Sequence, residues 1–146
     1  MGQQQLLLVI LVVIVVGIST IVAVNVLGIG ADNANRDAMR QDLVTAASNI
    51  QPLWERPLMM SGAGRDFNNL TIGSILYRLN IPGELAIDST SVENENGLYR
   101  VNIESSTSLS ITGEPRSGGG NIEITVSRDS ETNQWMYSIS EQSASN

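Results

Sequence analysis

The chain of 146 residues contains no cysteine and no histidine, and all eight of its basic residues are arginines. Without cysteine it has neither a disulfide framework nor a thiolate nucleophile. Without histidine it lacks the commonest general base and a usual ligand of zinc. The composition therefore predicts no metal, no cofactor and no enzymatic activity.

Aromatic residues are also scarce, with two tryptophans, three tyrosines and one phenylalanine, so a stacked electron-conducting wire is not expected. The net charge is −7, and residues 1–31 hold no charged side chain at all. Nucleic-acid binding needs clustered positive charge. We therefore predict no nucleic-acid partner, and a solvated acidic surface on the remaining part of the chain.

Residues 6–29 form an almost unbroken apolar run of about 24 residues, which is long enough to cross a hydrocarbon core of ~30 Å as a helix. The many valines and isoleucines would favour a strand in water. Inside a bilayer or a packed bundle, however, a helix satisfies its own backbone hydrogen bonds. We expect a helix here.

Three interpretations of this run compete. A cleaved secretory signal has a basic start and a shorter apolar core, whereas residues 1–5 carry no charge. A single-pass anchor would hold a head that binds a partner at the membrane. A helix of the third kind would anchor the subunit before assembly and then pack into the core of a filament.

The amphipathic continuation over residues 32–56 favours the third interpretation, because a plain anchor does not need it. Apolar side chains recur there at three- and four-residue steps, with polar residues opposite. Pro52 and Pro57 should end the helix near residues 51–56. The side chains predicted to pack against a sheet are Met39, Leu43, Ala47, Ile50 and Trp54.

Residues 57–146 predict a globular head. A loop is expected over residues 61–69, and Thr71 should cap a short helix that ends at Leu79. Asn96-Gly97 is a hairpin signal. Strands are expected over residues 85–92, 98–104, 108–112 and 121–128 and from Trp135 onward, with a flexible loop over residues 113–120.

Each predicted strand alternates apolar and polar residues, which is typical of an antiparallel sheet with one solvated face. Leu85 and Ile87 in the first strand, and Trp135, Tyr137 and Ile139 in the last, should point inward. The fold class is then α+β, with a long hydrophobic-then-amphipathic N-terminal helix packed on a small antiparallel sheet. The predicted parts are residues 1–31, 32–56 and 57–146.

Two polar motifs in the head resemble known kinds of site. Residues 129–133 offer oxygen ligands at alternate positions but lack the glycine and the final acid of a calcium loop, so a hairpin turn is predicted. Asn69 begins an Asn-Leu-Thr motif and is a possible glycosylation site.

The opening MGQQQLLL resembles a group of pilin-like bacterial proteins that begin in the same way. Residues 54–57, an aromatic–basic–proline segment, and the glycine-rich residues 61–64 are similar to theirs. The helix-then-sheet pattern resembles type IV pilins and pseudopilins. This resemblance implies that a prepilin peptidase cleaves after Gly2 and leaves Gln3 as the mature N-terminus.

The resemblance further implies a major structural subunit of an extracellular helical filament, made of identical subunits. Before assembly the chain would reside in the cytoplasmic membrane, from which a pilus assembly machinery would extract it. The alternatives are a pseudopilin or minor pilin of a secretion or DNA-uptake system, and the single-pass anchored binding domain. The residues assigned to the filament core are Leu6, Leu7, Leu8, Ile10, Leu11, Ile14, Gly17, Ile18, Ile21, Val24 and Leu27.

Leu7 stands where type IV pilins carry an acid, at mature position five, so no carboxylate is available to neutralise a neighbour's terminal amine. Because a buried, uncompensated amine is costly, we expect Gln3 to cyclise or the Gln3–Gln5 amides to bond between subunits. Arg36 and Arg40, taken alone, would place the C-terminal side in the cytoplasm. An external, polar, Ser/Thr-rich head on a filament is the orientation that we expect.

Overall fold

The computed structural model describes residues 2–142. Met1 of the predicted leader, and residues 143–146 at the end of the predicted head, lie outside this range. The chain divides into two compact units, Met1–Ala34 and Asn35–Asn146. The boundary falls two residues beyond Asp32, the first charged residue of the chain.

The predicted N-terminal helix is present, as helix α1 (Gly2–Ser48), followed by the short helix α2 (Ile50–Glu55). A turn at Asn49 separates the two. Pro52 lies in the first turn of α2, where the missing N–H needs no partner within the helix. Helix α2 ends before Pro57, as predicted, and the break at Asn49 was not foreseen.

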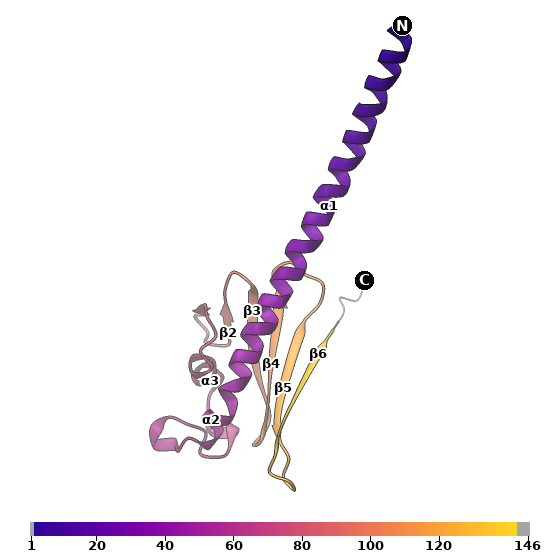
Figure 1. The fold of residues 1–146 in the computed structure, drawn as a ribbon. Coiled ribbons are helices and arrows are strands. Elements are labelled where there is room, and N and C mark those ends of the chain that lie inside the picture. Colours follow the sequence, from indigo (N-terminus) through magenta and orange to yellow (C-terminus); the bar gives the residue numbers. More distant parts are fainter. Residues whose placement is uncertain (1, 143–146) are drawn as a thin grey trace. The chain divides into compact units, whose positions relative to one another are not determined.

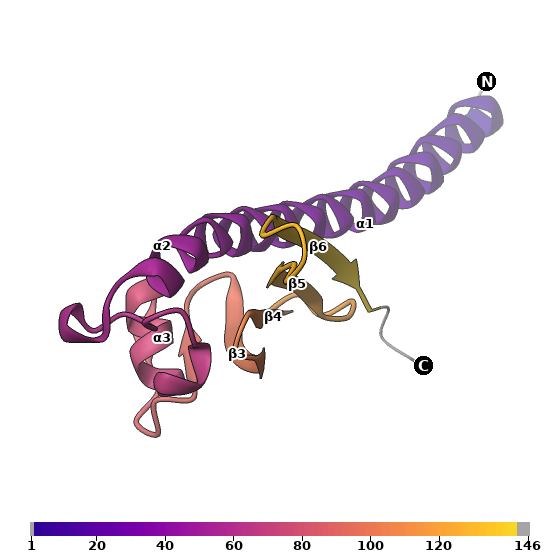
Figure 2. The same cartoon turned by 90° about the horizontal axis from the view of Figure 1, so that it is seen from below.

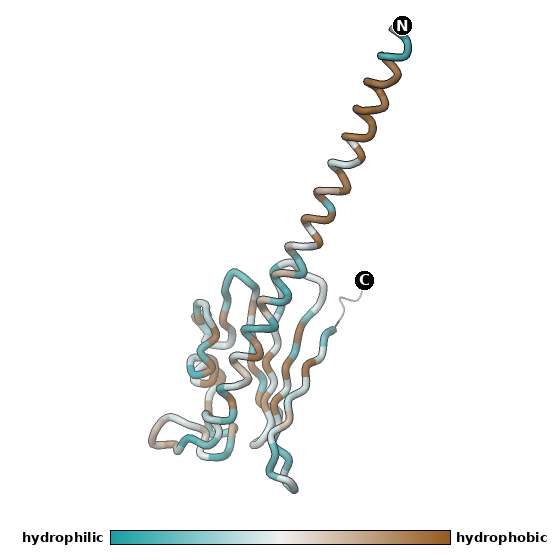
Figure 3. Tube along the Cα trace, viewed as in Figure 1, coloured by the Kyte–Doolittle hydropathy of each residue, from teal (hydrophilic) through white to brown (hydrophobic). Residues whose placement is uncertain are grey.

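The unit Met1–Ala34 is a bare apolar helix in its described part. Its large apolar side chains between Leu6 and Ile29 are all between 48% and 74% exposed. Figure 3 shows this apolar stretch in brown. By length and composition it can cross a membrane, with a mean hydropathy of 3.3 over an 18-residue window.

The second unit contains a six-stranded sheet with the strand order β1-β2-β3-β4-β5-β6. Every neighbouring pair is antiparallel. One face of the sheet is polar, as the alternation predicts. The strands are β1 (Glu84–Leu85), β2 (Ser91–Glu93), β3 (Gly97–Ser105), β4 (Ser108–Pro115), β5 (Ile122–Arg128) and β6 (Trp135–Glu141).

Residues 35–48 of α1, which belong to the second unit, lie across the apolar face of this sheet (Figures 1 and 2). Their buried side chains join Tyr99, Val101, Leu109, Ile111 and the apolar side chains of β5 in one core. The fold is therefore α+β, with the long helix packed on an antiparallel sheet, as the sequence predicted.

Three short helices follow α2. They are η1 (Leu58–Met60), η2 (Phe67–Asn69) and α3 (Ile72–Leu79). The predicted cap of α3 is confirmed, because the Thr71 hydroxyl accepts a hydrogen bond from the Ser74 backbone N–H. The expected loop over residues 61–69 is in part helical, since η2 occupies its last three residues.

The first predicted strand, over residues 85–92, was wrong. Two short strands, β1 and β2, stand in its place, joined by a turn in which the Asp88 carboxylate accepts from the Thr90 N–H. Ser89 has a φ of 56°. Asp and Ser bond to their own backbone in this way and so favour turns over strands. Ile87 is consequently fully exposed, and Leu85 is 41% exposed.

The predicted hairpin at Asn96-Gly97 is confirmed. The Asn94 N–H donates to the Gly97 carbonyl, and Glu93 faces Leu98 in the register. The predicted loop over residues 113–120 begins too early, however, because β4 continues to Pro115. Gly113 pairs with β3 and β5, so tertiary pairing overrides its low strand propensity.

The inward direction predicted for the last strand is correct, but two of the three side chains are not buried. Trp135 packs against the core, whereas Tyr137 and Ile139 remain 49% and 54% exposed. Both lie opposite buried residues of β5, so they are on the apolar face of the sheet. Because β6 is an edge strand, it has a neighbouring strand on one side only. The side chains of Tyr137 and Ile139 therefore stay about half exposed.

Candidate assembly surfaces

The residues assigned to the filament core form an uncovered apolar surface on α1. A side chain added at Gly17 would meet no atom within 4 Å. Ser19 and Thr20 donate their hydroxyls to the carbonyls of Val15 and Val16, one turn earlier. Their polarity is therefore satisfied inside the helix, and the segment presents an apolar surface to its surroundings.

The five residues predicted to pack on the sheet are all buried. Met39, Leu43, Ala47, Ile50 and Trp54 are between 0% and 4% exposed. Close approach to β4 depends on Gly113, where an added Cβ would lie 2.6 Å from the Met39 sulfur. A glycine in the strand thus lets the helix approach the sheet directly.

A polar contact joins α1 to the sheet beside this core, and we call its residues, Asp42, Tyr99, Asn94 and Asn96, the pin. The Asp42 carboxylate accepts from the Tyr99 hydroxyl at 2.6 Å and from the side-chain amides of Asn96 at 2.9 Å and Asn94 at 3.2 Å. Burial, together with the bond to Asp42, raises the pKa of Tyr99 far above its ordinary value. The three donors fix the β2–β3 hairpin against α1.

A second polar contact closes the N-terminal end of the head. Arg36 and Arg40 both pair with Glu141 at the end of β6, at 3.1 Å and 2.6 Å. The hydrogen bond from Arg40 holds the pKa of Glu141 below its usual range, and Glu141 in turn raises the pKa of Arg40. We call these three residues the clasp.

The glycine loop over residues 118–120 completes the clasp. All three glycines have positive φ, between 80° and 95°. Their carbonyls accept from one nitrogen of Arg36, at 3.4, 3.0 and 3.1 Å. A run of positive φ is strained for residues with a Cβ, so this loop wraps the guanidinium because it is made of glycine.

Aromatic contacts hold the opposite end of β6. The rings of Trp54 and Trp135 meet edge to face at 5.5 Å, and the guanidinium of Arg128 lies 4.6 Å from the centre of the Trp54 ring. Such contacts add about 0.5–1.5 kcal/mol beyond simple burial. The head is thus fixed to α1 and α2 at both ends of its last strand.

A rigid apolar protrusion follows α2, and we call residues Leu58–Met60 the knob. Their side chains are 57%, 99% and 65% exposed. The loop that carries them is nonetheless firmly held, since the N–H groups of Ala63 and Arg65 donate to the carbonyls of Leu53 and Trp54. Ala63 is itself fully buried. The fold therefore displays these apolar side chains on an ordered loop.

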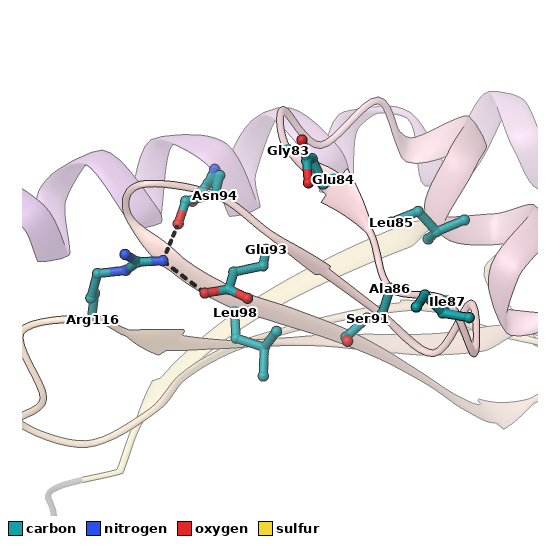
Figure 4. Close-up of a pocket in the computed structure, with 10 residues that line it drawn as sticks. All are labelled: Gly83, Glu84, Leu85, Ala86, Ile87, Ser91, Glu93, Asn94, Leu98 and Arg116. Carbon is teal, nitrogen blue, oxygen red and sulfur yellow. Dashed lines mark hydrogen bonds and ion pairs between the residues drawn. The ribbon is translucent and has the colours of Figure 1, made fainter.

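An open groove of about 550 Å³ lies at the β1 edge of the sheet (Figure 4). Its apolar lining comes from Leu85, Ala86, Ile87 and Leu98. Charged side chains form its rim. They are Glu84, Glu93 and Arg116.

The charges on this rim are unequally paired. Arg116 pairs with Glu93 at 2.7 Å. Glu84 lies directly opposite Glu93 in the register, and across residues 2–142 it has no ion pair. Like charges at such positions repel each other, so the rim has one carboxylate in excess.

The other predicted positions are placed as follows. Gly2 and Gln3 form the first turn of α1. The Asn69 side-chain amide, the possible glycosylation point, donates to the Ala63 carbonyl at 3.1 Å. The Asp129 carboxylate accepts from the N–H of Glu131, which lowers its pKa, so residues 129–133 form the predicted turn.

Metal-binding and unsatisfied polar sites were also considered. Between Gly2 and Gln142, no cluster of three or more acidic side chains is arranged to hold a metal ion. In the same range, no buried side-chain nitrogen or oxygen lacks a hydrogen-bond partner. The features of the described chain that remain without a partner are apolar surfaces and exposed charges.

Sequence reasoning missed the pin and the clasp. Asp42 follows Met39 by three residues and precedes Ala46 by four, so its carboxylate lies at the edge of the apolar stripe. This position was a signal that Asp42 contacts the sheet. Nothing in the pattern paired Arg36 or Arg40 with Glu141, which is more than a hundred residues away in the chain.

The geometry defines a class: an α+β head that includes residues 35–48 of α1, preceded in the chain by an apolar, exposed helical segment. Comparison of the chain with family models, with curated proteins and with solved structures gives no match.

Proposed function

We propose that this chain is the major structural subunit of an extracellular helical filament, which polymerises through its N-terminal helix. The observation that carries the proposal is the contrast within α1. Residues 6–29 are charge-free and uncovered, whereas the rest of the helix is fixed to the head by a core, a pin and a clasp. A helix that serves only as an anchor does not need its continuation built into the head.

Burial keeps the apolar segment out of water both in the membrane and in the filament, and close packing between helices favours the filament. Each large side chain gains about 1.5–3 kcal/mol on full burial, as an upper bound. In the membrane, lipid covers this surface before assembly. In the filament, identical helices cover one another, through a head-to-tail contact that does not close on itself.

The clasp bears on the orientation of the chain. The positive-inside rule concerns basic residues next to a membrane span. In the folded head Arg36 and Arg40 are engaged by Glu141 and by the glycine carbonyls. Acids count little in that rule, so the proposed head outside the membrane rests on its polar, Ser/Thr-rich surface. Prepilin-peptidase cleavage after Gly2, with Gln3 as the mature N-terminus, is proposed from the resemblance of the opening residues.

Electron microscopy of material sheared from producing cells, with mass spectrometry of the N-terminus, tests the proposal. We expect filaments that contain this chain and begin at Gln3, free or cyclised with loss of ammonia. A free Gln3 would exclude cyclisation and leave the glutamine amides to stabilise the terminus. A chain found only in membranes, unprocessed and monomeric in detergent, would instead identify an anchored binding domain.

A pair of variants separates assembly from anchoring. Gly17→Leu keeps the segment apolar, so membrane insertion should persist. If Gly17 lies where neighbouring helices approach closely, the added side chain blocks packing and filaments are lost. Val13→Leu is the matched control, since Val13 is outside the predicted core set. Equal filament yields from both variants would contradict close packing at Gly17.

A short, capped polymer that needs another chain to form would point to a pseudopilin or minor pilin. Purified chain that polymerises alone supports a major subunit. The filament length per unit of protein, measured by electron microscopy with and without the other envelope proteins, distinguishes the two outcomes.

A further inference from the structure

We propose that the knob of one subunit inserts into the groove at the β1 edge of the next copy of this chain. This contact would join the heads outside the helical core. It rests on the proposed filament, and it adds a second, specific interface to the non-directional packing of the apolar helices.

The first argument is the exposure of the apolar side chains of the knob to water. Met59 is 99% exposed, on a loop fixed to the ends of α2 by backbone hydrogen bonds. Its neighbours Leu58 and Met60 are also more than half exposed. Apolar clusters on an ordered surface mark interaction sites, and methionine adapts its shape to an apolar recess.

The second argument is apolar complementarity. The groove is lined by Leu85, Ala86 and Leu98, and Ile87 stands fully exposed at its end. A volume of about 550 Å³ is several times that of one methionine side chain. Met59 and Met60 would cover the leucines and isoleucine that the β1–β2 turn leaves in solvent.

The third argument is charge. Arg56 and Arg65 flank the knob, and neither forms an ion pair with an acid in residues 2–142. Across the groove, Glu84 faces Glu93 and forms no ion pair with a cation of residues 2–142. The basic flank of the knob therefore matches the excess carboxylate on the rim, and like charges would disfavour other docking partners.

The fourth argument is geometry. The groove rim is tied through Asn94 to Asp42 on α1, whereas the knob follows the end of α2 near Arg56. Asp42 and Arg56 are separated by roughly 20 Å along the helix axis, at 1.5 Å per residue. A knob and a groove at different levels give a head-to-tail contact with an axial step, which builds a fibre rather than a closed dimer.

Cross-linking within filaments tests this contact. The chain has no natural cysteine, so Met59→Cys combined with Ile87→Cys introduces one thiol on each surface. In sheared filaments treated with a short bis-maleimide, we expect a ladder of multimers on a denaturing gel. Met59→Cys combined with Met136→Cys is the matched control, because Met136 is 53% exposed but outside the groove. It should give no ladder.

Charge reversal provides an independent measurement on the full chain. Arg65→Glu and Glu84→Arg should each lower the filament yield by about fivefold, as expected for an exposed ion pair. The double reversal should restore it. Both substituted side chains are exposed, so circular dichroism of the three purified variants should be unchanged.

The outcomes separate the two proposals. Filaments that give no Met59–Ile87 ladder, or single reversals that leave the yield unchanged, overturn the knob-in-groove contact and leave the filament itself intact. Unsubstituted chain that forms no filaments at all overturns the filament, and this contact with it.

Discussion

Replacement of the partly buried Asp42 by alanine should destabilise the head far more than replacement of an exposed acid on a helix normally does. In the native structure one carboxylate oxygen accepts from Tyr99, Asn96 and Asn94. Without it the Asn94 amide keeps its second acceptor, the Pro82 carbonyl. The Tyr99 hydroxyl has no other acceptor between residues 2 and 142, and Tyr99 is fully buried.

The magnitude follows from that unpaired hydroxyl. A buried donor without a partner costs about 1–3 kcal/mol, and a hydrogen bond to a charged group contributes about 1.5–3 kcal/mol. We expect Asp42→Ala to lower the free energy of unfolding by about 2–4 kcal/mol. Tyr99→Phe removes the donor together with the bond and should cost only about 1–2 kcal/mol.

The two changes should not be additive. In the double variant no hydroxyl is left unpaired, so its cost should be about 1–2 kcal/mol less than the sum of the single variants. Urea unfolding of the full chain in a mild non-ionic detergent measures each value. The fluorescence of Trp54 and Trp135, which meet in the head, reports the transition.

Asp37→Ala is the matched control. Asp37 is on the same helix, its side chain is 70% exposed, and its one ion pair within the described residues is with Arg40. It should change the stability by about 0.5 kcal/mol or less. If Asp42→Ala behaves like this control, or if the Asp42 and Tyr99 effects simply add, the pin does not hold the helix to the sheet as argued here.

Three further outcomes follow from the packing and the clasp. Gly113→Ala should cost about 1–3 kcal/mol in urea unfolding, because the new Cβ would crowd Met39, and the added Met39→Ala change should relieve part of that strain. Acid should lower the free energy of unfolding of the head, because the pKa of Glu141 is lowered in the folded state. The stability that Glu141 contributes is present at neutral pH and is lost as the pH falls below the usual carboxylate range of about 4.3. Glu141→Gln should therefore flatten the acid limb of a stability–pH curve without abolishing it, because Asp88 and Asp129 also have lowered pKa values; an unchanged limb would exclude a role for the clasp. Ile139→Ser should alter the stability of the isolated subunit by less than about 1 kcal/mol, since the side chain is already half exposed.

Local patterns predicted the helices and most strands correctly for identifiable reasons. The charge-free run, the apolar stripe from Met39 to Trp54 and the Thr71 cap are signals within one element, and each was found where predicted. The alternation in β3, β4 and β5 is likewise local, and its inward apolar residues are buried, except Ile103, which is partly buried. In each case the hydrophobic period and the secondary structure agree.

Two kinds of prediction failed. In the first, residues that form a turn interrupt an alternating apolar pattern. In the second, the burial of a side chain depends on which element covers the sheet. Leu85 and Ile87 alternate as a strand would, yet Asp88 bonds to the backbone and turns the chain between them and Val92. Tyr137 and Ile139 have the right period for a core strand. Their exposure depends on the position of β6 at the sheet edge, which no pattern within the strand encodes.

The sequence by itself determined that the chain has a charge-free helix, an amphipathic continuation and a β-rich head, because hydrophobic periodicity is written into neighbouring residues. Only the tertiary structure decided which distant groups meet. It brought Arg36 and Arg40 to Glu141, Asp42 to Tyr99, and Glu84 to a like charge on the next strand. Such contacts depend on strand order and register, so they exist only once the sheet has formed against the helix.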